Sequence, residues 1–336
     1  MEMDILNEII GQLRGFFGIG GILKIMESGD YRSLLTYEGV TSVIGPVLPI
    51  LLVIELVRGL VYRKFDIGAY RIPFLTYLFN SFLGRFISFG MVLVCIGLFE
   101  RHAPFTLPMN AWGFLVGYVA WEFAHFIYHF LAHKVRLFWC LHSTHHAPEH
   151  MNLFVSHAHF FLEAPYADVI RTTICILLGV PPPMLFVIMF IDGTWGSFIH
   201  IGDTMMKKAD LGALGRFILT PSHHRVHHAR NPQYMDTNYC NLLNIWDRIF
   251  RTYQPEMDEV PVEYGITRNM KKNSFLDAYF GEIVALAGDI RRAPGLKNKF
   301  LYLFMPPGWS HTGEHKTATA LKRLSAGNST GIMRDN

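Results

Sequence analysis

The chain has 336 residues, of which 51% are hydrophobic and only 17% are charged, and its formal net charge is +3. Because an ordinary soluble domain carries about 25% charged residues, this composition favours a lipid-facing or lipid-binding surface. The small net charge, with no dense Lys/Arg run before the C-terminal region, argues against a nucleic-acid-binding protein. The four cysteines form no C-x-x-C pair, so they indicate neither a zinc ribbon nor a redox dithiol.

The first predicted element is an amphipathic or interfacial segment over residues 1–40, whose acidic start is not typical of a secretory signal peptide. A helix that crosses a bilayer needs about 20 mostly apolar residues. Residues 43–62, 74–99 and 111–131 meet this requirement, and we expect each to span a membrane. Residues 167–180 and 184–202 flank a triple proline and are interpreted as a tilted hairpin or a re-entrant pair.

These elements predict an all-α, multi-pass integral membrane protein. Transmembrane helices and a catalytic core are assigned to residues 41–255, a cap segment to 256–311, and a polar, disordered tail to 312–336. Lysines and arginines follow the first span, the third span and the hairpin, which predicts that these loops share the cytoplasmic side. The histidine clusters fall at the same ends of the spans, so we expect a histidine-rich cap and an active site on the cytoplasmic side.

Histidine is the unusual residue, because 14 of the 17 histidines lie between His125 and His228. In the third predicted span, Glu122, His125, His129 and His133 fall on one helical stripe. The last two are i,i+4 neighbours, so their imidazoles are close enough to hold one metal ion. An ionisable group inside a span is costly and points to function, although a polar stripe can also pack against a neighbouring helix. We expect Glu122 to orient a ligand, and the role of His125 stays open.

Two further clusters share the spacing H-x-x-H-H, and each places its histidines on one helical face. They consist of His142, His145 and His146, and of His224, His227 and His228, with His223 adjacent to the second cluster. One such cluster alone is also explained by a solvated turn, but three in order indicate a metal site. Eight neutral imidazoles suit iron or zinc and are too many for one ion, which predicts two metals.

The surroundings of the clusters narrow the chemistry. A structural zinc site closes with four ligands, so eight histidines around two ions leave open positions for a reaction. The apolar, membrane-side setting favours a lipid substrate. The sequence contains neither a G-x-S-x-G elbow, nor an H-E-x-x-H motif, nor a G-x-G-x-x-G fingerprint. If the protein activates O₂, the electrons therefore come from outside the chain.

Two segments, HFLAHKVRLFWCLHSTHHAPEHMN and TPSHHRVHHARNPQYMDTNYCNLLNIWDRIFRTY, resemble the membrane-bound di-iron fatty acid hydroxylase (sterol desaturase) superfamily. The similarity extends over residues 115–255 and is greatest to the alkylglycerol monooxygenase-like branch, which also has a sequence like PPGW at 306–309. The resemblance implies as metal ligands His129, His133, His142, His145, His146, His224, His227 and His228, with His200 and His223 as further candidates. It implies ligand-orienting roles for Asn231, Asp236, Asn238, Tyr239 and Asp247, although Asp247 is equally typical of a helix cap or salt bridge.

The resemblance further implies a non-haem oxidoreductase that uses two iron ions, O₂ and external electrons. Such an enzyme hydroxylates or desaturates a C–H bond of a lipid such as a sterol, a fatty acyl chain or an alkylglycerol ether. The donor implied is a reduced pterin, a b-type cytochrome or a ferredoxin. Phe130, Lys134, Cys240 and Arg251 depart from the family pattern, which leaves the substrate and the donor open but removes no ligand. Two extra histidines, His157 and His159, are additional candidates for ligation.

Three alternatives remain at this stage. A di-zinc membrane lipid hydrolase would use the same histidines and a carboxylate base, for which Glu122, Glu149 and Glu163 are available. A metal transporter or sensor should show polar residues continuing through several spans, whereas these histidines gather at one face. A degenerate family member with a scaffold role is disfavoured because all eight histidines are present.

Overall fold

The computed structural model describes residues 10–11, 14, 19–30, 32–33, 36–62, 66–80, 83–203, 205–207, 209–271 and 274–332. Within these residues the regular secondary structure is helical, apart from two isolated bridges, Ile218 with Leu243 and Ala229 with Tyr264. The predicted all-α fold is confirmed. Most of the first 18 residues of the predicted interfacial segment lie outside the described part of the chain.

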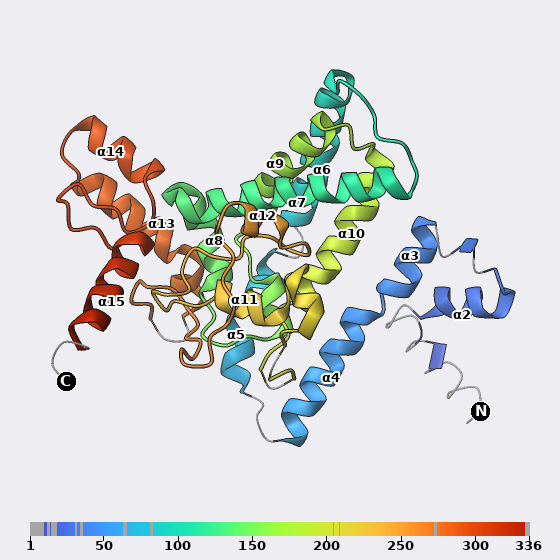
Figure 1. Cartoon of the computed structure of the whole chain (residues 1–336), viewed down its shortest axis with the longest axis horizontal. Helices are drawn as coiled ribbons and strands as arrows, with labels where there is room; N and C mark the ends of the chain where they lie inside the picture. The colour runs from blue at the N-terminus through green and yellow to red at the C-terminus, as the bar shows by residue number, and fades with distance from the viewer. Residues whose placement is uncertain are drawn as a thin grey trace.

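The N-terminal helices form an arm at one side of the molecule (Figure 1). They are α2 (Gly20–Ser28), α3 (Tyr37–Ile44) and α4 (Val47–Val61). In the described part of the chain, residues 37–61 are the one helical stretch long and apolar enough to cross a membrane. α4 is anchored by a buried carboxylate, because Glu55 accepts the backbone N–H groups of Leu153 at 3.0 Å and Gly202 at 3.4 Å.

The described residues of the predicted span at 74–99 belong to two named helices. α5 (Ile67–Asn80) ends inside it and α6 (Leu83–Phe99) begins inside it. The polar Asn80 at the end of α5 donates a hydrogen bond to the backbone oxygen of His159 and accepts one from Tyr279 at 2.6 Å. These tertiary contacts tie the end of α5 to segments that are distant in the sequence.

The central helix α7 (Ala111–Lys134) carries the first histidines and lies across the middle of Figure 1. It begins after Asn110, whose side chain accepts the Gly113 N–H at 2.9 Å. The short η2 (Glu100–His102) precedes it, and α6 and α7 both pack against α9 (Glu163–Leu177). α7, α9 and the helix that follows α9, α10 (Pro182–Phe198), share a buried core that includes Tyr118, Trp121, Ile176, Leu185 and Ile188.

The predicted hairpin consists of α9 and α10 (Pro182–Phe198). The turn between them passes through Gly179 at φ +80°, where an added Cβ would lie 2.7 Å from the backbone oxygen of Phe105. Glycine is therefore required both by the left-handed conformation and by the close approach. Pro181 has an extended backbone and precedes α10, and Pro182 occupies the first helical position, which proline favours.

The other elements between α7 and α13 are short. They are α8 (Arg136–His146), η3 (Leu153–His157), η4 (Gly212–Arg216), α11 (Pro221–His227) and α12 (Ile245–Ile249). α8 follows α7 after Val135 alone, so the chain turns sharply between the two histidine-bearing helices. α11 lies near the centre of the view in Figure 1.

The C-terminal helices lie on the side opposite the N-terminal arm (Figure 1). They are α13 (Phe275–Arg292), α14 (Gly295–Phe304) and α15 (Ala318–Ile332). α13 packs against α8, where Arg136 lies 3.3 Å from Glu282. The tail from 312, for which composition predicts disorder, instead contains α15. Half-buried Leu321 lines a cavity beside the histidines, which gives this polar segment a tertiary partner that composition does not reveal.

Candidate metal centre

Two groups of buried histidines lie next to each other among the described residues. One group contains His129, His133, His142, His146 and His227, and the other contains His145, His200, His224 and His228. Within each group the ring nitrogens that would bind a metal all lie within 4.8 Å of one another. The structure therefore brings together the eight core histidines singled out from the sequence and adds His200 to the second group.

Each H-x-x-H-H cluster is divided between the two groups. On α8, His142 and His146 are one turn apart and share a face, whereas His145 is rotated away from both. On α11, His227 faces the first group, and His224 with the following His228 faces the second. Three clusters along the chain thus become two clusters in space.

In the first group, the Nε2 atoms of the rings converge. His142 Nε2 lies 3.1 Å from His129 Nε2 and 3.1 Å from His146 Nε2. The buried Nε2 atoms of His133 and His227 have no hydrogen-bond partner in the described structure. A buried polar atom without a partner is costly, and a bound ion would satisfy it.

The second group has the same arrangement. His200 Nε2 lies 3.2 Å from His145 Nε2 and 2.9 Å from His224 Nε2, and His224 Nε2 lies 3.0 Å from His228 Nε2. Two nitrogens bound at right angles to one ion, with bonds of about 2.1 Å, stand about 3 Å apart. The spacing in both groups is that of ligands around a common ion.

The outer ring nitrogens of several histidines face hydrogen-bond acceptors. Nδ1 of His129, His200 and His227 lies 2.9, 2.6 and 2.8 Å from the backbone oxygens of Tyr239, Gly196 and Thr237, respectively. A carbonyl oxygen only accepts, so Nδ1 carries the proton and Nε2 keeps its lone pair. This is the tautomer in which a histidine binds a metal through Nε2.

The charge state of the rings is also suited to ligation. Burial lowers the pKa of His145, His146, His224 and His228 well below the usual range, and neighbouring imidazoles lower it further. The rings are therefore neutral at pH 7, as metal binding requires. Imidazole donors of this kind fit iron, zinc or copper.

Several histidines considered from the sequence lie outside the two groups. His223 does not join its neighbours, because its ring contacts the Thr220 backbone N–H in a capping box and its Nε2 lies 2.7 Å from the Tyr253 hydroxyl. His125 lies 3.8 Å from Asp192. His157 is exposed in η3, whereas His159 is stacked on His145 with 4.2 Å between ring centroids.

The loop after α11 supplies two of the carbonyl acceptors. Asp236 and Asn238 have left-handed backbones, with φ of 56° and 57°, and Thr237 and Tyr239 present their oxygens to His227 and His129. Asn and Asp tolerate this conformation better than most residues, which explains their presence in the motif.

The polar residues expected to orient ligands act at different distances. Asp236 lies 3.7 Å from His133 Nδ1 and pairs with Lys134. Besides Tyr239, whose backbone oxygen accepts His129 Nδ1, the remaining four act through the backbone or away from the rings. The Asn238 side chain donates to the backbone oxygens of His223 and Gln254, and Asn231 contacts Pro261 and Glu263. The Asp247 carboxylate accepts the backbone N–H groups of Tyr239 and Cys240. The Glu122 carboxylate accepts those of Asn241, Leu242 and Leu243.

Sequence reasoning considered Glu163 only as the base of a hydrolase. In the structure its carboxylate lies 2.5 Å from His142 Nδ1 and 2.9 Å from His159 Nδ1. The available signal was the i,i+4 spacing of His159 and Glu163. Without the tertiary structure, however, that spacing does not reveal the contact with His142.

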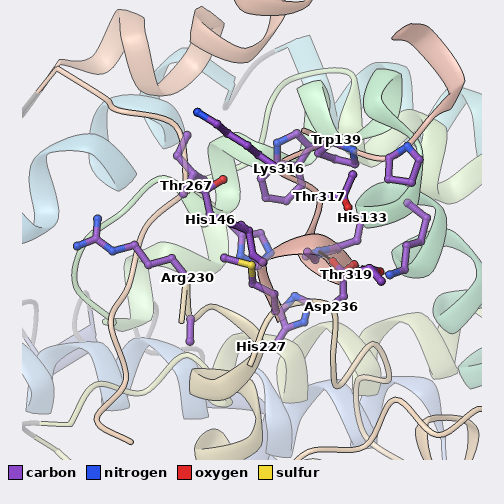
Figure 2. Close-up of a pocket in the computed structure, with 18 of the residues that line it drawn as sticks. His133, Trp139, His146, His227, Arg230, Asp236, Thr267, Lys316, Thr317 and Thr319 are labelled. Atoms are coloured by element: carbon purple, nitrogen blue, oxygen red, sulfur yellow. Dashed lines mark hydrogen bonds and ion pairs between the residues drawn. The ribbon is translucent and has the colours of Figure 1, made fainter. Parts of the chain in front are cut away.

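A cavity of about 120 Å³ borders the first group. Figure 2 shows His133, His146 and His227 at this cavity together with residues of the C-terminal segment. Lys316, Thr317 and Thr319 belong to that segment, so the tail covers one side of the candidate site.

A second cavity, of about 200 Å³, borders both groups and is lined by His129 and His142 of the first group and by His145, His200 and His224 of the second. Ser156, His159 and Ala164 line both this cavity and an apolar one of about 410 Å³. The walls of the apolar cavity include Phe89, Val92, Phe160, Phe186 and Met189. An apolar space therefore adjoins the second histidine group from the direction of α6.

Comparison with known proteins agrees with this site. Residues 114–252 match the model of the family described as fatty acid hydroxylase. Alkylglycerol monooxygenase of Homo sapiens is 31% identical over 215 residues, which cover 64% of this chain and 46% of that protein. Alkylglycerol monooxygenase of Danio rerio is 29% identical over 290 residues, which cover 84% of this chain and 63% of that protein.

A bacterial relative is more distant. The ornithine lipid hydroxylase OlsE of Rhizobium tropici is 27% identical over 169 residues, which cover 50% of each chain. The chain spans about half the length of most of these curated relatives. No solved structure matches it.

Proposed function

Because the chain belongs to the fatty acid hydroxylase family through residues 114–252, we propose that it is an O₂-dependent membrane lipid monooxygenase with one iron ion in each histidine group. The observation that carries this proposal is the convergence of neutral, buried Nε2 atoms in two adjacent groups. The ligands proposed are the five histidines of the first group and the four of the second.

The donor set favours a reactive centre over a structural one. When bound, two iron ions supply the activation of O₂ and the abstraction of hydrogen from an unreactive C–H bond. The residues of this chain hold the ions, fix the ring tautomers and keep water away from the reaction. The transporter alternative lacks a supporting observation, since the histidines form two closed, buried groups.

A lipid substrate is supported by the cavities. The apolar cavity beside α6 can take a hydrocarbon chain, and the walls that it shares with the second cavity lead toward His145. Most of a chain bound there would be removed from water, which is the main source of affinity for such a ligand. We propose that the substrate chain enters from this side and that the carbon attacked lies in the cavity that borders both groups.

The membrane setting is proposed on the same grounds. Residues 37–61 are suited to crossing a bilayer, and α6 also exposes large apolar side chains, among them Phe86, Leu93 and Leu98. We propose a multi-pass topology with the active site on the cytoplasmic side, as the Lys/Arg distribution predicts. The electron donor is external, and a reduced pterin, a b-type cytochrome and a ferredoxin are the candidates.

Metal content of the detergent-purified full-length chain tests the proposal. We expect about two irons per chain in the wild type and a clear loss in His145→Ala, whereas His150→Ala, a change at an exposed histidine, should retain both. Stoichiometric zinc with no iron, even after expression in iron-rich medium, would favour a di-zinc hydrolase. No bound metal at all would refute the proposal.

Isotope labelling tests the reaction itself. Reconstituted protein, an alkylglycerol and a reductant are incubated under ¹⁸O₂, with unlabelled water. We expect ¹⁸O in the lipid product and no product under nitrogen. A product that forms anaerobically and takes its oxygen from water would contradict the monooxygenase assignment.

A further inference from the structure

We infer that Glu163 is a positioning residue that fixes His142 in the first histidine group and joins the two groups through His159. This inference rests on the proposed function, because it assigns Glu163 a role toward the ion of the first group. The role is separate from that of a metal ligand or a hydrolytic base.

The contacts of Glu163 are complete and directional. The carboxylate is buried in the first turn of α9, and Oε1 accepts the Tyr128 hydroxyl at 2.7 Å and His142 Nδ1 at 2.5 Å. Oε2 accepts His159 Nδ1 at 2.9 Å. Three donors from three different elements therefore converge on one carboxylate.

His142 differs from the other anchored rings in its acceptor. His129, His200 and His227 donate Nδ1 to neutral backbone oxygens, whereas His142 donates to a carboxylate. A hydrogen bond to an ionised acceptor is shorter and stronger, and it makes the opposite ring nitrogen a better donor to metal. The Nε2 atom so favoured lies 3.1 Å from the Nε2 atoms of both His129 and His146.

The geometry argues against a separate metal site at His142, His159 and Glu163, although their polar atoms lie close together. His159 Nε2 lies 3.1 Å from the Ser156 backbone oxygen, and its Nδ1 faces Glu163. Both partners are acceptors, so both ring nitrogens donate and His159 has no lone pair for a metal. Glu163 acts on the ion through His142.

The same ring connects Glu163 to the second group. His159 and His145 are stacked, with 4.2 Å between centroids and an interplanar angle of 11°. His145 Nδ1 is buried and has no hydrogen-bond partner in the described structure. The position of the His145 ring therefore depends on packing against His159, which Glu163 holds in place.

The test uses Fe(II) binding to the detergent-purified full-length chain, measured by chelator competition and by Mössbauer spectroscopy of ⁵⁷Fe. Glu163→Leu removes both acceptor oxygens at similar volume, and Glu163→Gln keeps one acceptor for His142. The matched control is Glu282→Gln, which alters a buried carboxylate paired with Arg136 on α8 but touching no histidine of the groups.

We expect Glu163→Leu to bind one iron 10–100-fold more weakly, as is typical when a carboxylate partner of a ligand histidine is lost. Glu163→Gln should recover most of the affinity but retain an altered spectrum for that iron, because an amide oxygen is a weaker acceptor. Wild-type affinity in Glu163→Leu, or an equal loss in Glu282→Gln, would overturn the inference. If Glu163→Leu does not fold, a wild-type Mössbauer spectrum of Glu163→Gln would overturn the inference instead.

The outcomes separate this inference from the proposed function. A wild-type chain that binds no iron contradicts the proposed function itself. Two irons in the wild type together with an unchanged Glu163→Leu contradict only the role of Glu163.

Discussion

The buried carboxylate of Asp247 holds the loop that anchors the first histidine group, so the effect of removing it on stability can be predicted. Oδ1 accepts the Tyr239 N–H at 2.8 Å and the Thr252 hydroxyl at 2.6 Å, and Oδ2 accepts the Cys240 N–H at 2.8 Å. The Tyr239 backbone oxygen in turn accepts His129 Nδ1. Losing the carboxylate should therefore reduce both the stability of the fold and the affinity for metal.

The magnitude follows from the number of stranded donors. Asp247→Asn places an amide NH₂ against the Cys240 N–H and leaves that one donor without an acceptor, at a cost of about 1–3 kcal/mol. Asp247→Ala leaves two backbone donors unsatisfied and should cost about 2–6 kcal/mol. For a chain of this length, 1 kcal/mol corresponds to about 1.5 °C in Tm. We expect shifts of about 1.5–4.5 °C for Asn and about 3–9 °C for Ala.

The assay is thermal unfolding in detergent, followed by tryptophan fluorescence, with iron content measured on the same samples. Asp258→Ala, a change at an exposed carboxylate of a nearby loop, is the control and should change stability by no more than about 0.5 kcal/mol. If Asp247→Ala melts within 1 °C of the wild type, the Asp247 carboxylate does not stabilise this loop.

Three further predictions address the cavities and the metal. Val92→Trp fills the apolar cavity and should lower lipid turnover at unchanged iron content. Val94→Trp, on the exposed side of α6, should leave lipid turnover unchanged. Equal effects of the two variants would argue against this cavity as the binding site of the lipid chain. Leu321→Asp should weaken the packing of α15 and accelerate the loss of iron to a chelator. Leu324→Asp, at an exposed position, should not change that rate. Identical rates in the two variants would show that the tail does not protect the first group. Removing metal should lower the Tm because ions bind the folded state selectively, and re-adding Fe(II) should restore it; a Tm that is independent of metal would contradict the two sites.

The histidine spacing alone determined much of the site. A repeat of three and four residues places side chains on one helical face whatever the fold, so His129 with His133 and His142 with His146 were paired by local geometry. The excess of imidazoles over the needs of one ion predicted two metals, and the apolar composition predicted a helical, lipid-associated protein. The comparisons confirm the family that these motifs resemble.

The partition of the histidines was decided only by the tertiary structure. His145 and His146 are adjacent in sequence but belong to different groups, and His223 turns away from His224 to cap α11. Helical periodicity specifies the direction in which a side chain points relative to its own axis. It does not specify which other helix lies in that direction.

The same reason explains the remaining differences. Glu163 contacts His142 because α9 packs against α7 and α8. α15 packs beside the first group, where Leu321 lines the cavity. Both contacts join residues that are distant in sequence or that have an unremarkable local pattern. The sequence by itself determined the histidines that each helix can offer. The packing of α7, α8, α10 and α11 decided which of them meet in each group, because that choice depends on contacts between distant segments.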